Sequence, residues 1–226
     1  MNENIYIIVP CFNETGVIRE TLTALLDKGY HVIVVDDGSE RNLFLEIADL
    51  PVHCLRHEIN LGQGAALQTG MDYSMQCGAE IVVHFDADGQ HRAEDIPVLV
   101  APILENMADV ALGSRFLSET DAAAVPIVRR LVLKAARLIN LLFTGMWLTD
   151  AHNGLRVVNR KALAKIKITE NRMAHATEII KLIKINDLRC CERATHVVYT
   201  PYSRRKGQTT LNAVNIFFDL ILNRFR

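Results

Sequence analysis

Two aspartates and a glutamine follow a short apolar run near the middle of the chain. The run covers residues 81–85, and Asp86, Asp88 and Gln90 come directly after it. An apolar run that stops at acids and a glycine predicts a strand buried on both faces, ending at the carboxyl edge of a parallel sheet. Carboxylate and amide oxygens are hard ligands, so this spacing indicates a site for Mg2+ or Mn2+ carrying a diphosphate. The alternative is a turn whose acids only cap the next helix.

Cations gather in a second stretch, near the end of the sequence. Residues 202–210 place Arg204, Arg205 and Lys206 beside a glycine and two threonines. Guanidinium and ammonium groups next to hydroxyls can clamp phosphate oxygens, whereas a bare charge run is more often a solvated loop. We interpret this loop as a candidate phosphate clamp.

Alternating strands and helices must position these residues. The helix after the first strand is expected to open at Asn13-Glu14 and to run to Lys28, where Gly29 stops it. Strands that alternate with helices imply an α/β fold with a Rossmann-like, mostly parallel sheet flanked by helices. Ligands bind at the carboxyl edge of such a sheet. The predicted strands cover residues 5–10, 32–35, 52–56, 81–85 and 109–113.

Glycine patterns exclude two common nucleotide-binding classes. Gly62-Gln63-Gly64 lacks the third glycine of the nicotinamide fingerprint and follows the third strand instead of the first. The chain also has no G-x-x-x-x-G-K-[ST] phosphate loop, which excludes a P-loop NTPase.

Length and composition favour a single globular domain over residues 1–226, with 50% hydrophobic residues. The net charge of -1 hides an asymmetry, because residues 1–121 carry a net charge of -14 and residues 122–226 carry +13. Such a division suggests a cation site in the first half and a phosphate, anionic lipid or nucleic-acid surface in the second. Mutual neutralisation of the halves is the alternative. Five cysteines without C-x-x-C spacing favour reduced thiols in a cytoplasmic protein.

A basic amphipathic segment covers residues 126–148. Arg130, Lys134 and Arg137 form one cationic stripe on it, and charges in mid-run argue against a transmembrane span. Such a helix can lie in the lipid headgroup layer, or it can pack on the core with a solvated face. We expect a protein that is peripheral at the inner face of the membrane, bound directly or through a separate membrane subunit.

Histidines near the acidic motif have simpler interpretations. His84 lies within the apolar run, so we expect a hydrogen-bonded core histidine there. His91, directly after the motif, is the histidine with the strongest claim to the site.

Five short motifs then follow one another in a characteristic order. They are Val-Pro-Cys-Phe-Asn-Glu (9–14), Val-Asp-Asp-Gly-Ser (35–39), Asn-x-Gly-x-Gly (60–64), Asp-Ala-Asp-Gly-Gln (86–90) and Gly-Ser-Arg-Phe (113–116). Together they resemble the family 2 glycosyltransferases of the GT-A fold, in particular the dolichol- and polyprenyl-phosphate mannosyltransferase branch. The resemblance covers nearly the whole chain. It implies a GT-A-type domain with amphipathic helices toward its C-terminal end.

The resemblance also implies a role for each matching residue on the donor side. Asp86 and Ala87 would contact the sugar nucleotide, and Asp88 and Gln90 would hold the divalent metal. The residues implied at the nucleotide base and ribose are Pro10, Phe12 and Glu14, with Val35 and Asp37 beside them.

Three arginines complete the site that the resemblance implies. Arg115 would lie near the sugar and diphosphate, and Arg129 would face the acceptor phosphate. Arg204 would close over the donor diphosphate.

The chemistry depends on the acceptor. Breaking the bond between sugar and diphosphate builds negative charge on the leaving group, which a metal and arginines stabilise without proton transfer. A lipid phosphate is already anionic and needs no base, whereas a hydroxyl acceptor needs a carboxylate to take its proton. Asp150 and Glu178 are the candidates for that base, with structural roles as the alternative. A single in-line displacement would invert the anomeric centre.

We therefore expect an inverting glycosyltransferase that moves a hexose from a GDP- or UDP-linked donor to a polyprenyl phosphate such as dolichyl or undecaprenyl phosphate. Transfer to a saccharide hydroxyl is the alternative reaction. A non-catalytic, membrane-associated partner is the alternative from another class. Nucleic acid is not an expected partner, because no aromatic residues are interleaved with the cations of Arg204 to Lys206.

Overall fold

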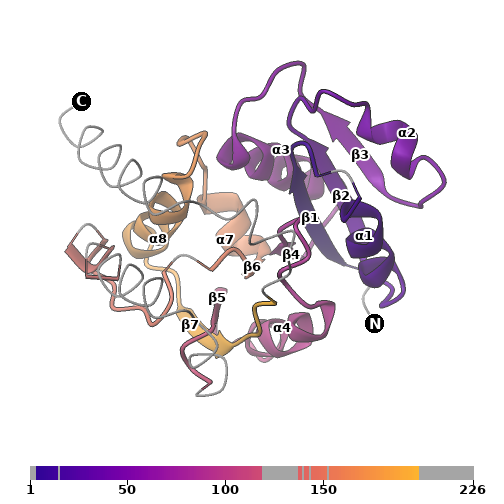
Figure 1. Ribbon diagram of the computed structural model, residues 1–226. Helices are drawn as coiled ribbons and strands as arrows, with labels where there is room; N and C mark the ends of the chain where they lie inside the picture. The colour runs from indigo at the N-terminus through magenta and orange to yellow at the C-terminus, as the bar shows by residue number, and fades with distance from the viewer. Residues whose placement is uncertain are drawn as a thin grey trace.

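The computed structural model describes residues 4–14, 16–118, 137–138, 140–142, 144–151 and 153–198. A seven-stranded sheet with the strand order β3-β2-β1-β4-β6-β5-β7 forms the centre of the molecule (Figure 1). β6 runs antiparallel to β4 and β5, and the other neighbouring strands are parallel. The expected mostly parallel sheet is confirmed. The strands are β1 (Ile5–Cys11), β2 (His31–Asp36), β3 (His53–Arg56), β4 (Ile81–His84), β5 (Val110–Ser114), β6 (Arg156–Asn159) and β7 (Cys190–Ala194).

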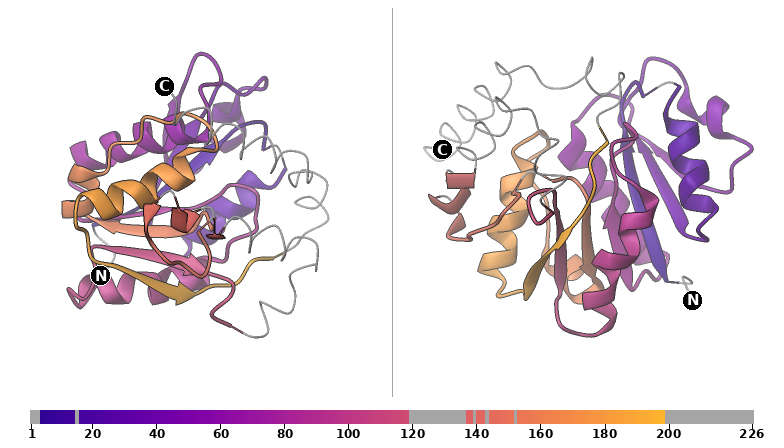
Figure 2. Two further views of the ribbon diagram at one scale, coloured as in Figure 1. Left: turned by 90° about the vertical axis from the view of Figure 1, so that its left-hand side faces the viewer. Right: turned by 60° about the horizontal axis from the view of Figure 1, so that its bottom comes forward.

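Helices cover both faces of the sheet (Figure 2). One face carries α1 (Ile18–Leu26) and α4 (Ile96–Leu104), the latter preceded by the 3-10 turn η1 (Ala93–Asp95). The opposite face carries α3 (Gln63–Gln76), α7 (Arg160–Lys165) and α8 (His175–Ile185). A short helix, α2 (Leu43–Ile47), lies in the connection between β2 and β3.

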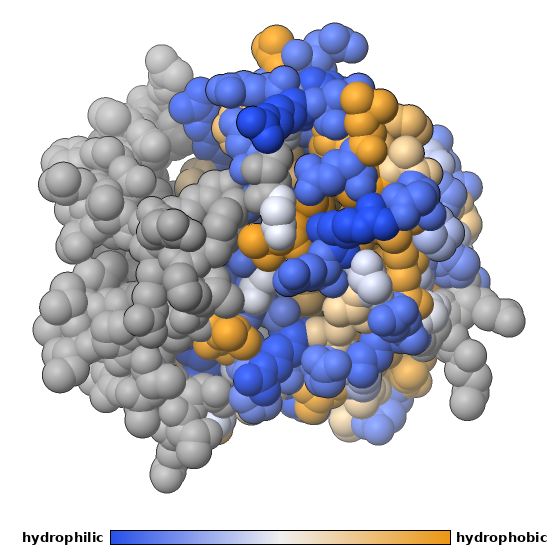
Figure 3. Space-filling view, turned by 45° about the vertical axis from the view of Figure 1, so that its right-hand side comes forward, coloured by the Kyte–Doolittle hydropathy of each residue, from blue (hydrophilic) through white to orange (hydrophobic). Residues whose placement is uncertain are grey.

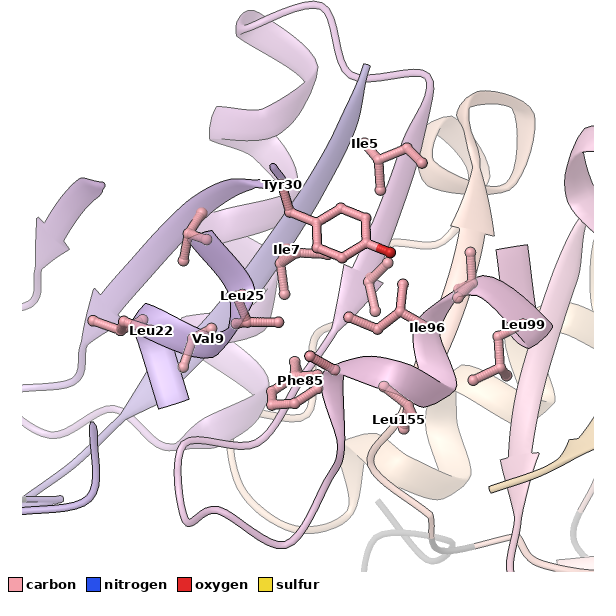
Figure 4. Close-up of a cluster of buried hydrophobic side chains, with 14 of the residues drawn as sticks. Ile5, Ile7, Val9, Leu22, Leu25, Tyr30, Phe85, Ile96, Leu99 and Leu155 are labelled. Carbon is pink, nitrogen blue, oxygen red and sulfur yellow. The ribbon is translucent and has the colours of Figure 1, made fainter. Parts of the chain in front are cut away.

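Two hydrophobic clusters hold these layers together. In β1, Ile7 and Val9 point to the cluster with α1 and α4, whereas Ile8 points to the cluster with α3 and α8. Figure 4 shows the first cluster, in which Leu22 of α1 and Ile96 of α4 meet the strand side chains. Because successive side chains of a strand alternate in direction, a strand buried on both faces must be apolar throughout. This explains the continuous apolar runs in the sequence.

The first helix begins later than expected. Asn13 adopts a left-handed conformation with φ 56°, and α1 starts only at Ile18. The Asn13 backbone N–H donates to Ser39 Oγ at 2.9 Å, and its side-chain oxygen accepts from the Glu40 N–H at 3.0 Å. The expected helix start at Asn13 is therefore wrong, because this residue ties the loop after β1 to the loop after β2.

Two strands were not predicted. β6 has the sequence Arg-Val-Val-Asn, and β7 has Cys-Cys-Glu-Arg-Ala, so neither shows a long apolar run. β6 nevertheless enters the middle of the sheet, where it brings residues 153–156 beside the carboxyl end of β4.

Hydrophilic residues predominate on the face seen in Figure 3, with hydrophobic ones between them. None of the helices within the described residues is long and apolar enough to cross a membrane. Most of the expected basic helix and the whole segment 199–226 lie outside the described residues.

Candidate active site

The acidic motif lies where the order of the strands reverses. β1 has β2 on one side and β4 on the other, and the chain builds β2 and β3 before it crosses to β4. In open α/β sheets, ligands bind outside the carboxyl ends of the strands at such a switch point. Residues 12–14, 37–39 and 85–90 follow β1, β2 and β4. The segments expected to bind the donor therefore share one edge of the sheet (Figure 1).

Groups from three segments hold Asp86. Gln63, in the first turn of α3, donates from Nε2 to Oδ1 at 2.9 Å, and His91 donates from Nε2 to Oδ2 at 3.0 Å. The carboxylate also lies against Gly154, where an added Cβ would stand 2.1 Å from Oδ2. The Asp86 side chain remains 30% exposed. It is thus fixed in orientation and still accessible to a ligand.

Opposing effects set the charge of Asp86. Burial on its own raises the pKa of this carboxyl, but the hydrogen bond from His91 and the positive charge of Arg156 outweigh burial. The pKa of Asp86 consequently lies below its ordinary value, which keeps the group ionised at neutral pH.

Asp88 and Gln90 form the outer part of the motif. Asp88 accepts from the Gln90 backbone N–H at 3.0 Å and from Gln90 Nε2 at 2.5 Å, so the carbonyl oxygen of the Gln90 amide is directed away from Asp88. Burial raises the pKa of Asp88, and the negative charge of Asp86 raises it further. A divalent cation relieves this repulsion, and carboxylate and amide oxygens are ligands that fit Mg2+ or Mn2+. For Gln90 to share a cation with Asp88, its amide must turn its oxygen toward Asp88.

The motif offers only part of a coordination shell. Across the part of the chain that the structure describes, no group of three or more His, Cys, Asp and Glu side chains is placed to hold a metal ion. Asp86 and Asp88 are a carboxylate pair of the kind that Mg2+ uses together with waters and substrate phosphates.

Asp37 shapes the loop that leads into α3. Its carboxylate accepts from the backbone N–H groups of Leu61 at 3.0 Å and Gly62 at 2.7 Å, and from His57 Nδ1 at 2.7 Å. His57 Nε2 lies 2.9 Å from Thr69 Oγ1 on α3. These bonds use three of the roughly four acceptor positions of a carboxylate. Asp37 therefore stands at the expected edge, buried and already engaged by the protein.

The other residues expected at the nucleotide differ in what they can offer. Phe12 is 40% exposed and Glu14 is half-buried, so both side chains reach the surface at the end of β1. Val35 and Ala87 have buried side chains that pack in the core, which leaves only their main chains for a ligand. Pro10 is buried within β1.

Arg115 and Asp150 form a buried ion pair beyond the end of β5. Arg115 Nε lies 2.5 Å from Asp150 Oδ2, and a second guanidinium nitrogen, Nη2, lies 3.2 Å from Oδ1. Asp150 also accepts from the Arg115 backbone N–H at 3.2 Å. Both Asp150 oxygens are occupied by Arg115. The two residues expected in separate catalytic roles are therefore partners.

Glu192 on β7 supports this pair. Its carboxylate accepts from the Thr149 N–H at 2.8 Å and from the Asp150 N–H at 3.1 Å. Thr149 Oγ1 donates to the same carboxylate at 2.7 Å and lies 2.6 Å from Ser114 Oγ. Sequence reasoning missed Glu192, because only the pairing of β5 with β7 brings it to this turn.

Glu178 is engaged in shaping a loop. It accepts from the Thr169 backbone N–H at 3.0 Å and from the Glu170 N–H at 2.9 Å. The loop packs on the start of α3, where the Gly64 N–H donates to Asn171 O at 2.8 Å. These bonds favour a structural role for Glu178 over the role of a base.

A buried basic group lies behind Asp86 and was also missed. It consists of His84, Arg156 and His175, which are 2%, 3% and 4% exposed. The expected hydrogen bonds of His84 are absent, because neither ring nitrogen has a partner among the described residues. The one signal for this group in the sequence was Arg156, which stands directly before the apolar pair Val157-Val158.

Two expected arginines cannot be placed. Arg129 and Arg204 lie outside the described residues, as do Arg130 and Lys134 of the basic stripe.

Comparison with known proteins identifies the family of this chain. Residues 6–167 match the family described as Glycosyl transferase family 2. This chain belongs to that family. The resemblance seen in the sequence motifs is thereby confirmed, and the protein is a glycosyltransferase.

Two relatives of this family 2 glycosyltransferase act on related substrates. A UDP-N-acetylglucosamine–dolichyl-phosphate N-acetylglucosaminyltransferase of Methanococcus voltae is 29% identical, over 96% of this chain and 95% of the relative. A polyprenol monophosphomannose synthase of Mycolicibacterium smegmatis is 30% identical, over 72% of this chain and 64% of the relative.

Solved structures share the fold of this glycosyltransferase. A glucosyl-3-phosphoglycerate synthase from Mycobacterium tuberculosis, in complex with Mn2+, UDP and glucosyl-3-phosphoglycerate, has a TM-score of 0.61 and 15% sequence identity. The match covers 90% of this chain and 75% of that one, which confirms the GT-A-type architecture.

Proposed function

We propose that this glycosyltransferase moves a hexose from a nucleotide diphosphate sugar to a polyprenyl phosphate, with inversion at the anomeric carbon. Asp88 and Gln90 would hold Mg2+ or Mn2+, which supplies positive charge to the leaving diphosphate. Asp86, oriented by Gln63 and His91, would position the donor beside it. Arg115 would add positive charge near the sugar and diphosphate.

The hydrogen bonds of the two candidate bases carry the proposal for the acceptor. Both oxygens of Asp150 are bound by Arg115, and Glu178 is bound by the backbone of its loop. A hydroxyl acceptor would need one of these engaged carboxylates to take a proton as well. A phosphate acceptor is already anionic, so it makes no such demand.

The relatives support the same acceptor class. The M. voltae protein is named for transfer to dolichyl phosphate, and the M. smegmatis protein for a polyprenol monophosphate product. Their sugars differ, so the donor of this chain is a GDP- or UDP-linked hexose whose identity a binding screen must decide.

Arg137 and Trp147 support contact with a membrane, which we propose is at its inner face. The Arg137 guanidinium lies 4.0 Å from the centre of the Trp147 ring, and Trp147 is 62% exposed. An exposed tryptophan beside a cation suits the headgroup layer. Flotation with anionic liposomes tests this: we expect binding that Arg130/Lys134/Arg137→Ala reduces. Protein that ignores liposomes, before and after the change, would leave docking to a membrane subunit as the route.

Calorimetry tests the donor site. We expect one of UDP-glucose, UDP-N-acetylglucosamine and GDP-mannose to bind in the presence of Mn2+ and to be lost with a chelator or with Asp88→Ala. Asp72→Ala, an exposed aspartate paired with Lys167, is the matched control and should bind normally. If none of the three donors binds with Mn2+ present, the result would favour the alternative that the protein is a non-catalytic partner.

A transfer assay tests the acceptor. The bound donor, labelled in its sugar, is offered to undecaprenyl or dolichyl phosphate in detergent and, separately, to soluble saccharides. We expect label in the lipid fraction. Label in the saccharides alone would establish the alternative reaction.

A further inference from the structure

Arg156 is a buried charge without a direct partner in the part of the chain that the structure describes. It opens β6 and is 3% exposed, yet none of the described residues forms a hydrogen bond or ion pair with its guanidinium. A buried, unpaired cation is costly, so nearby opposite charge must compensate for it. The question is which groups face it.

The strand register places Arg156 behind Asp86. His84 of β4 pairs with Arg156 of β6, and continuing the antiparallel register sets Asp86 opposite Gly154. In a continued ladder, Arg156 and Asp86 would be diagonal neighbours on one face, about 7–8 Å apart, a separation within reach of a long side chain. Because Gly154 has no side chain, the Asp86 carboxylate can lie against the chain two residues before Arg156.

The titration behaviour of these groups agrees with the register. Burial lowers the pKa of Arg156 to about 10, against the opposing effect of Asp86 and Asp150. The charge of Arg156 in turn contributes to the lowered pKa of Asp86. Each group thus feels the charge of the other without a direct bond.

Arg156 is the only cation of the buried basic group at neutral pH. Burial first, and the charge of Arg156 second, lower the pKa of His84 to about 3 and that of His175 to about 4. Both imidazoles are therefore neutral. One fixed positive charge, that of Arg156, therefore acts on the Asp86 carboxylate of the motif.

We propose that Arg156 sets the order in which ligands enter the site. Its charge weakens the binding of a divalent cation on its own and favours the diphosphate, so that the cation binds firmly only together with the nucleotide. This inference rests on the proposed cation site at Asp88. It assigns Arg156 a positioning role through charge, without contact with substrate.

Two titrations with opposite expected signs test it. Arg156→Met removes the charge and nearly keeps the length of the side chain, and no direct hydrogen bond to a described residue is lost, so the fold should persist. Without nucleotide, we expect Mn2+ to bind on the order of tenfold more tightly, because a repulsive charge is gone. In a chelator, inorganic pyrophosphate should bind severalfold more weakly. A site that is merely loosened would bind both ligands more weakly.

Two further variants serve as controls. Arg156→Lys keeps the charge and should retain both wild-type affinities. Arg160→Met changes an exposed arginine just after the far end of β6, where it donates to Ala79 O at 3.0 Å, and should leave both unchanged. If circular dichroism shows that Arg156→Met is unfolded, Arg156→Gln undergoes the same titrations.

The outcomes distinguish a failure of the role proposed for Arg156 from a failure of the proposed cation site. Mn2+ binding that Arg156→Met leaves unchanged or weakens would overturn the role of Arg156 while the cation site stands. Wild-type protein that binds no Mn2+, with pyrophosphate or without it, would overturn the proposed function and this inference with it.

Discussion

Arg115 and Asp150 join two loops through a buried ion pair, with Nε 2.5 Å from Oδ2 and both side chains almost fully buried. Removing one member leaves the other charge buried and unpaired, which typically costs about 3–5 kcal/mol. We therefore expect Arg115→Met and Asp150→Leu each to lower the free energy of unfolding by about that amount. The double variant should cost clearly less than the sum, as measured by urea denaturation.

A double-mutant cycle contains its own control for this pair. Losses that simply add would mean that the two side chains act independently, which does not agree with contacts of 2.5 Å and 3.2 Å between them. Such additivity would contradict the assignment of Asp150 as the anchor of Arg115.

Glu178 gives a prediction that separates a base from a structural carboxylate. We expect Glu178→Ala to lose about 1–3 kcal/mol, because the Thr169 and Glu170 N–H groups lose their acceptor. Glu178→Gln keeps one acceptor oxygen and should retain most stability and most glycosyl transfer. The measurements are urea unfolding and initial rates. A Gln variant that is folded and as inactive as the Ala variant would mean that Glu178 takes a proton.

The sequence predicted those elements whose signals were local. β1, β2 and β4 are buried on both faces, so their apolar runs were visible without knowledge of their neighbours. β6 has only two apolar residues, and its place depends on pairing with strands distant in the sequence. The start of α1 was misplaced because Asn13 bonds to the loop at Ser39, a contact that the fold creates.

The residues of the site divide in the same way, into those with a local sequence signal and those without one. Acids that end a strand identified Asp86 and Asp88, because strand ends of a parallel sheet meet at one edge. Gln63, Glu192 and Arg156 were missed, since each reaches the site only through tertiary packing or strand register.

Gly154 is predicted to be essential for the position of Asp86. A methyl group there would stand 2.1 Å from Asp86 Oδ2, so Gly154→Ala must displace the carboxylate or the strand. We expect the Mn2+-dependent binding of the donor to fall at least tenfold, while circular dichroism remains that of the folded protein. Calorimetry with the donor that the binding screen selects makes the measurement. Normal binding by a folded Ala variant would show that Asp86 takes no part in holding the donor.

The lowered pKa of His175 predicts how the free energy of unfolding depends on pH. Burial and the charge of Arg156 lower its pKa to about 4 in the folded protein, against roughly 6.5 in an unfolded chain. Between these values the unfolded chain binds the extra proton, so the stability due to neutral His175 is complete above about pH 6.5 and falls as the pH drops toward 4. The slope for one such group is about 1.4 kcal/mol per pH unit. His175→Asn keeps a donor for Arg172 O, which His175 Nδ1 approaches at 2.7 Å, and removes the titration. Urea unfolding at pH 7, 6 and 5 should give a shallower decline for this variant. Parallel declines for the variant and the wild type would contradict a neutral, buried His175.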